Sequence, residues 1–110
     1  MKADYQILIV DDDESIRRML GAVLSREGFQ TVMAADGEEG LALFRSASPD
    51  IVLMDIRMPG RSGIEAMRAM LDLRPGAVVI LMTAYADLDT AVQAIKNGVF
   101  DFVIKPFDLA

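Results

Sequence analysis

The sequence contains no cysteine and no histidine, and each absence removes a class of chemistry. Without cysteine there are no disulfides and no thiolate nucleophile, which fits a cytoplasmic protein. Without histidine there is no imidazole acid–base catalysis, no common nitrogen ligand for metals and no phosphohistidine within the chain. The chemistry that remains available uses carboxylates, hydroxyls, lysine, the backbone and a hard metal ion.

Long apolar runs and positive charge are also scarce. No run approaches the roughly 18–20 apolar residues that a membrane-spanning helix needs, and residues 1–6 lack the apolar core of a signal peptide. The net charge of −6 argues against direct binding of this segment to nucleic acid or to an anionic membrane. With 110 residues, 53% of them hydrophobic, the chain suits one compact domain, which we place at residues 1–110.

Short apolar runs alternate with segments of helical periodicity along the whole chain. Strands are predicted at residues 7–10, 31–34, 51–54, 78–82 and 101–104, and helices at about 14–27, after 36, after 62 and around 88–95. The segments 36–39 (DGEE) and 62–65 (SGIE) have the spacing of a capping box. Five strands separated by helices imply right-handed crossovers and a parallel sheet, which is the α/β doubly wound class.

One helix of this architecture is missing from the pattern. A five-stranded parallel sheet needs helices on both faces, so the alternation predicts a fifth helix after the last strand. The sequence ends at Ala110, a few residues after that strand. We therefore expect a domain truncated after its fifth strand, because a naturally short chain would leave apolar sheet surface exposed.

Residues with reactive or metal-binding side chains follow four of the five predicted strands, at their carboxyl ends. Residues 11–13 (DDD) follow the first strand, Asp55 the third, Thr83 the fourth and Lys105 the fifth. In open α/β sheets, ligands bind at this edge, near the point where the strand order reverses. A single aspartate at a strand end is most often a helix cap, which is the interpretation we prefer for Asp13. The joint pattern of acids, hydroxyl and cation predicts a functional site.

Clustered carboxylates repel one another unless a cation neutralises them. Mg²⁺, or Mn²⁺ in its place, is the fitting ion, because it combines one or two carboxylates with waters and a phosphate oxygen. We expect Asp12 and Asp55 to bind it, Asp11 to act through water and the backbone carbonyl of Arg57 to complete the set. A carboxylate beside such an ion can attack phosphorus and form an aspartyl phosphate.

Four segments resemble, in the same order, the signatures of the receiver domain of bacterial response regulators, the CheY-like superfamily of two-component signalling. They are residues 7–18 (ILIVDDDESIRR), 54–63 (MDIRMPGRSG), 81–84 (LMTA) and 101–107 (DFVIKPF). The resemblance implies the flavodoxin-like strand order 2-1-3-4-5 and covers the chain except for a last helix. Residues 82–109 resemble, more narrowly, the receivers of nitrogen-regulation-type (sigma-54) activators, which continue into an ATPase and a DNA-binding domain.

The resemblance also implies a role for each residue of the predicted site. It makes Asp55 the phosphoacceptor, Asp11 and Asp12 the acidic pair, Thr83 the switch hydroxyl, Lys105 the catalytic lysine and Phe102 the switch aromatic. Because the chain has no histidine, the phosphoryl group must come from a partner sensor histidine kinase or a small phosphodonor. We expect a signalling switch that catalyses its own phosphorylation and dephosphorylation, changes the surface around the fourth helix and fifth strand, and controls an attached transcriptional output domain. The same surface would serve a homodimer.

Two other interpretations stay open on the sequence alone. Residues 11–15 (DDDES) fit D-x-D-x-S, close to the nucleophile loop of haloacid-dehalogenase-type phosphatases, with Asp11 as the nucleophile. That hypothesis leaves Asp55 and Lys105 without a role. Alternatively, the chain is a docking module that works without phosphorylation, in which case it would bind neither Mg²⁺ nor beryllofluoride.

Overall fold

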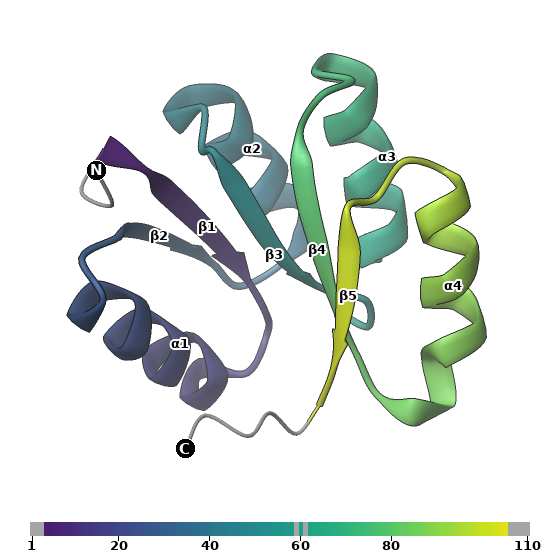
Figure 1. Cartoon of the computed structure of the whole chain (residues 1–110), viewed down its shortest axis with the longest axis horizontal. Coiled ribbons are helices and arrows are strands. Elements are labelled where there is room, and N and C mark those ends of the chain that lie inside the picture. Colours follow the sequence, from purple (N-terminus) through teal and green to yellow (C-terminus); the bar gives the residue numbers. More distant parts are fainter. Residues whose placement is uncertain (1–3, 59, 61, 106–110) are drawn as a thin grey trace.

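The described part of the chain forms a five-stranded parallel sheet and four α-helices, with strand order β2-β1-β3-β4-β5 (Figure 1). This computed structural model describes residues 4–58, 60 and 62–105. The strands are β1 (Gln6–Val10), β2 (Gln30–Ala34), β3 (Ile51–Asp55), β4 (Val78–Thr83) and β5 (Asp101–Ile104). The helices are α1 (Glu14–Arg26), α2 (Gly37–Ala47), α3 (Gly63–Leu73) and α4 (Leu88–Lys96), and a 3-10 turn, η2 (Tyr85–Asp87), precedes α4. The predicted fold class and strand order are confirmed.

The first three helices each begin at a side chain that caps them. Asp13, Asp36 and Ser62 have extended backbones, and their side-chain oxygens accept hydrogen bonds from amides of the first helical turn. At the two predicted capping boxes, the Glu39 amide donates to the Asp36 side chain at 2.8 Å, and the Glu65 amide donates to the Ser62 side chain at 3.2 Å. None of the described helices is long and apolar enough to cross a membrane.

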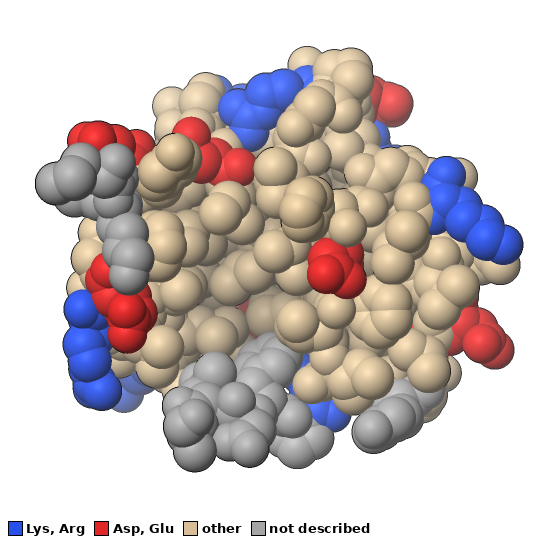
Figure 2. Space-filling view, in the orientation of Figure 1, with Lys and Arg blue, Asp and Glu red and all other residues tan. Residues whose placement is uncertain are grey.

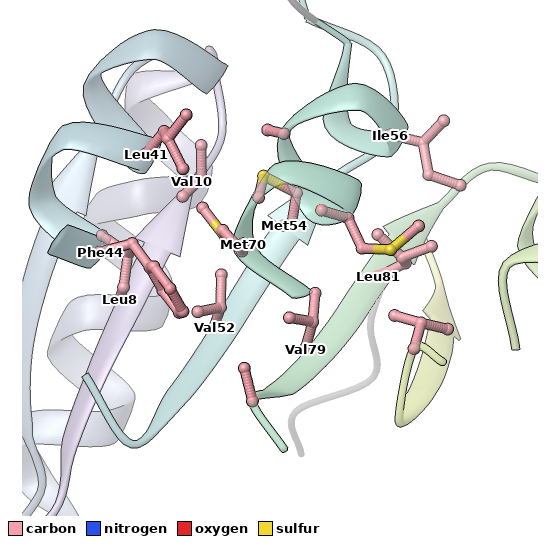
Figure 3. Close-up of a cluster of buried hydrophobic side chains, with 14 of the residues drawn as sticks. Leu8, Val10, Leu41, Phe44, Val52, Met54, Ile56, Met70, Val79 and Leu81 are labelled. Carbon is pink, nitrogen blue, oxygen red and sulfur yellow. The ribbon is translucent and has the colours of Figure 1, made fainter. Parts of the chain in front are cut away.

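Helices cover both faces of the sheet, and the larger core lies under α2, α3 and α4. Figure 3 shows Leu41 of α2 beside Val10 of β1, and Phe44 of α2 near Leu8 of β1 and Val52 of β3. A smaller cluster forms where α1 packs on the opposite face. Side chains of β1 contribute alternately to the two clusters, which confirms the prediction that its continuous apolar run is covered on both sides.

α4 meets the sheet through alanines rather than through its larger apolar residues. The spacing of Leu88, Val92 and Ile95 predicts the helix correctly, yet Val92 and Ile95 are 42% and 41% exposed. Ala91 and Ala94 are buried instead, because a methyl group lets the helix axis lie closer to the strands than a branched side chain does. The outer surface of α4 is therefore partly apolar.

On the face of the sheet that carries α1, apolar side chains extend beyond that helix. Val103 of β5 is exposed, and Leu53 and Ile80 are only half-buried. The middle of the view in Figure 2, over the strands, is almost free of charged residues. No helix follows β5 among the described residues, and these side chains give this part of the sheet a partly exposed apolar surface.

Two leucines on helices allow a matched test of this core. Leu41 is 5% exposed and Leu73 is 52% exposed. We expect Leu41→Ala to lower the free energy of unfolding by about 2–5 kcal/mol, because it leaves a cavity between α2 and the sheet. Leu73→Ala should lower it by less than about 1 kcal/mol. Urea unfolding of both variants measures the difference, and equal losses would contradict the packing described here.

Candidate functional site

The strand order reverses between β1 and β3, and acidic residues stand where these two strands end. Asp11 directly follows β1, and Asp55 is the last residue of β3. Val10 pairs with Met54 in the sheet, so the two aspartates emerge level with each other at the same edge. The side chain of Asp11 is completely buried, and that of Asp55 nearly so.

Three carboxylates meet in this crevice. Asp11, Asp12 and Asp55 each offer one oxygen, and these atoms all lie within 4.8 Å of one another. Carboxylate oxygens in this number suit a hard divalent cation such as Mg²⁺ or Mn²⁺. Asp12 is exposed, which leaves access for the waters that Mg²⁺ normally retains. The donor set therefore fits the expected metal.

Asp13, the third consecutive acid, points elsewhere. Its Oδ1 accepts hydrogen bonds from the amides of Ser15 at 2.8 Å and Ile16 at 3.4 Å. The carboxylate caps α1, in agreement with the interpretation preferred from the sequence.

Lys105 supplies the positive charge of the crevice. Its Nζ lies 2.6 Å from Oδ2 of Asp11 and 3.4 Å from Oδ1 of Asp55. Partial burial by itself would lower the pKa of Lys105, but the hydrogen bond to Asp11 and the charges of Asp55 and Asp11 raise it above its usual value. The amine is therefore held as an ammonium between the two acids.

The environment of Asp55 favours its protonated form. Burial away from water raises the pKa of this carboxyl from 3.8 to about 6, and the charge of Asp11 acts in the same direction. The charge of Lys105 and its hydrogen bond oppose the shift without cancelling it. A cation that entered the crevice would favour the ionised carboxylate.

The remaining predicted residues do not contact the three crevice carboxylates through their described side-chain hydrogen bonds. Thr83 is buried at the end of β4, and its hydroxyl donates to the carbonyl of Ala84 at 3.0 Å. Phe102 is half-buried and packs against the larger core cluster. The Arg57 guanidinium turns toward α4 and binds Asp87, whose hydrogen bond and charge raise the pKa of the arginine. Pro106 and Phe107, at the end of the last signature segment, lie outside the described residues.

A family model described as the response regulator receiver domain matches residues 7–110. The chain belongs to this family. Regulatory protein AtoC of Escherichia coli (strain K12) is 51% identical over 109 residues, which are 99% of this chain and 24% of AtoC. The DNA-binding transcriptional regulator NtrC of Salmonella typhimurium is 43% identical over 103 residues, 94% of this chain and 22% of NtrC.

Solved structures agree with the family assignment. A response regulator receiver domain protein from Clostridium thermocellum superposes with a TM-score of 0.90 at 33% identity, covering 94% of this chain and 84% of that one. The similarity to AtoC and NtrC confirms the expected likeness to nitrogen-regulation-type activators. This receiver domain spans less than a quarter of the length of those two relatives.

Two supporting residues of the receiver site were missed by sequence reasoning. Arg17 donates from Nη1 to the backbone carbonyl of Asp11 at 2.7 Å, which ties α1 to the acidic loop. Gly63 lies so close to Asp55 that a Cβ there would overlap the Asp55 carbonyl oxygen. Glycine at the start of α3 was the available signal, since it is a poor helix former inside a capping box. The absence of a side chain at Gly63 lets α3 begin directly against the end of β3.

Substitution of Gly63 tests its close approach to Asp55. Gly63→Ala should lower the free energy of unfolding by about 1–3 kcal/mol, because the methyl group forces the Asp55 backbone and α3 apart. Helix propensity alone predicts the opposite sign. Gly76→Ala is the matched control, since a Cβ at Gly76 meets nothing within 4 Å, and it should change stability by less than about 1 kcal/mol. Chemical denaturation measures both, and a stabilised Gly63→Ala variant would show that the contact is absent.

The raised pKa of Asp55 makes the stability of the fold depend on pH. Because folding raises the pKa of Asp55 from 3.8 to about 6, the protein loses stability as the pH rises through this interval. Asp55→Asn removes this loss and should be more stable than the unsubstituted chain by about 1–2 kcal/mol at pH 7.5 after allowance for solvent screening. The difference should shrink toward pH 4.

Thermal and urea unfolding in the presence of a metal chelator test this expectation. The exposed Asp72→Asn substitution on α3 removes a charge outside the crevice and serves as the control. A stability difference between Asp55→Asn and the unsubstituted chain that stays constant from pH 4 to pH 7.5 would contradict the raised pKa.

Proposed function

We propose that this receiver domain accepts a phosphoryl group on Asp55 with Mg²⁺ bound beside it. The observation that carries the proposal is the meeting of three carboxylates within 4.8 Å, two of which contact the Lys105 ammonium. Such a site has the positioned charges that phosphoryl transfer requires, and it needs no acid–base pair. Asp55 is the acceptor of choice, because Asp11 is more deeply buried and is already bonded to Lys105.

Each residue has a defined part in the proposed transfer. Asp12 and Asp55 would hold the ion directly, Asp11 through water, and the Arg57 carbonyl would complete the protein ligands. Bound Mg²⁺ supplies positive charge against the phosphoryl oxygens. An Asp55 oxygen forms the new bond to phosphorus while the bond to the donor breaks.

After transfer, the neighbouring side chains rearrange around the new charge. The Lys105 ammonium moves from the carboxylates to a phosphoryl oxygen. The Thr83 hydroxyl exchanges the Ala84 carbonyl for the phosphoryl group, and Phe102 turns further into the space that Thr83 leaves. The result is a changed surface at α4 and β5.

The partners of this switch follow from its chemistry and its relatives. The chain has no histidine, so the phosphoryl donor is a sensor histidine kinase or a small phosphodonor. Because AtoC and NtrC are about four times longer than the region matched here, we place residues 1–110 as the receiver of a longer cytoplasmic transcription regulator. Because this segment has a net charge of −6 and would be repelled by DNA phosphates, we expect any DNA contact to be made by the output domain. The exposed apolar residues Val92 and Ile95 of α4 would support a homodimer.

Incubation with acetyl phosphate and Mg²⁺ tests the proposed acceptor. The chain should gain the mass of one phosphoryl group, and the gain should disappear with Asp55→Asn or when Mg²⁺ is chelated. Asp72→Asn, which removes an exposed carboxylate of α3, should be labelled like the unsubstituted chain. Mass spectrometry under conditions that preserve acyl phosphates gives the readout.

Three outcomes separate the alternatives. Labelling that survives Asp55→Asn but not Asp11→Asn would support the dehalogenase-type nucleophile. A chain that binds neither Mg²⁺ nor beryllofluoride would be a docking module. Loss of labelling in Asp55→Asn, with the Mg²⁺ requirement and with normal labelling of Asp72→Asn, is the result that the proposal expects.

A further inference from the structure

α4 begins differently from the other helices in the described part of the chain. Asp87 occupies its N-cap position but makes no capping hydrogen bond, although aspartate is among the best capping residues. The caps of α1, α2 and α3 have extended backbones, whereas Asp87 has φ −108° and ψ 14° and continues the η2 turn into the helix. The first amides of α4 are therefore left without a side-chain cap.

The Asp87 carboxylate is used by another segment instead. Its Oδ1 accepts a hydrogen bond from Nε of Arg57 at 2.9 Å and lies 2.8 Å from Nη2 in the same ion pair. The Asp87 side chain is 11% exposed and that of Arg57 is 73% exposed. Arg57 lies two residues after Asp55, so this ion pair joins the loop after the proposed phosphoacceptor to the start of α4.

The two uses of Asp87 call for different arrangements of this residue. A capping aspartate has an extended backbone, whereas Asp87 has ψ 14° and its Oδ1 is bonded to Arg57. The Asp87 amide donates to the Ala84 carbonyl at 2.9 Å. The same carbonyl accepts the Thr83 hydroxyl. The Thr83 hydroxyl is thus bonded to the residue that precedes η2, and the Arg57 side chain to the last residue of η2.

We propose that Asp87 is an exchange residue, which binds Arg57 in the resting chain and caps α4 when Asp55 is phosphorylated. The trigger rests on the proposed function. A phosphoryl group brings about −1.5 to −2 charges to Asp55, two residues from Arg57, and competes with Asp87 for the guanidinium. The resting pair is easily displaced, because Arg57 is largely in solvent, where ion pairs are weak.

The exchange alters a surface that a partner can contact. A groove of about 630 Å³ lies between the loop after β3 and the start of α4, with Arg57 and Asp87 in its wall. Apolar and hydroxyl side chains form the rest of the lining, namely Ile56, Met58, Ile64, Ser62 and Thr90. Opening of η2 and separation of the ion pair would change the shape of this groove, which links the state of Asp55 to the first turn of α4.

Amide hydrogen exchange in α4 tests the proposal without any phosphate. Asp89 and Thr90 hold the amides that a cap at Asp87 would bind. Arg57→Gln frees the carboxylate, so exchange at these two amides should slow by about fivefold, the effect of a typical cap. Asp87→Asn should slow exchange in the same way, because asparagine also caps but forms no ion pair. In Arg57→Gln combined with Asp87→Ala, the protection should disappear.

The control breaks an ion pair elsewhere. Arg18 and Glu14 form an exposed pair on α1 at 2.8 Å, and Arg18→Gln should leave the exchange of the α4 amides unchanged. If Arg57→Gln leaves exchange at Asp89 and Thr90 unchanged or makes it faster, Asp87 does not exchange partners and the proposal is overturned.

A second arm adds Mg²⁺ and beryllofluoride to the unsubstituted chain. The same amides should become protected, and Asp55→Asn should abolish the effect. If beryllofluoride binds without protecting them, the link to Asp55 is overturned. If it does not bind at all, the proposed phosphorylation fails, while the Arg57→Gln result still decides whether Asp87 can exchange its partner.

Discussion

Two carboxylates buried side by side need a compensating cation, and Lys105 provides it. Asp11 and Asp55 end adjacent strands, where the sheet removes most of their water. Unpaired buried carboxylates are costly, so the ammonium at 2.6 Å and 3.4 Å is what permits them to lie together. Because Lys105 and Asp11 are 94 residues apart, the same contact joins the end of β5 to the end of β1.

This charge balance leaves the crevice short of positive charge. Lys105 does not cancel the effect of burial and of Asp11, and the pKa of Asp55 stays raised at about 6. A divalent cation therefore has an electrostatic reason to bind here, beyond the number of oxygen ligands. The proposed phosphoryl transfer depends on this shortage of positive charge. A phosphoryl group on Asp55 adds negative charge to the crevice, and it therefore draws the Lys105 ammonium and the Thr83 hydroxyl away from their resting partners.

The sequence predicted the fold well and the site in part. Periodicity and strand-end residues identified all five strands, the four described helices and the acidic cluster, because these features depend on neighbours along the chain. The packing of α4 was not predictable in the same way. The spacing of its large apolar residues predicted the helix, but Ala91 and Ala94 form its buried face.

The sequence by itself determined which groups stand at the carboxyl edge of the sheet and which chemistry they support. Only the tertiary structure decided which partners those groups choose. Asp13 and Asp87 both precede a helix, yet the first caps its helix and the second binds an arginine 30 residues away. Capping is a local property that a sequence pattern can indicate. The choice between a cap and an ion pair depends on whether another segment brings a charge within hydrogen-bond distance, and that distance is set by the folded sheet.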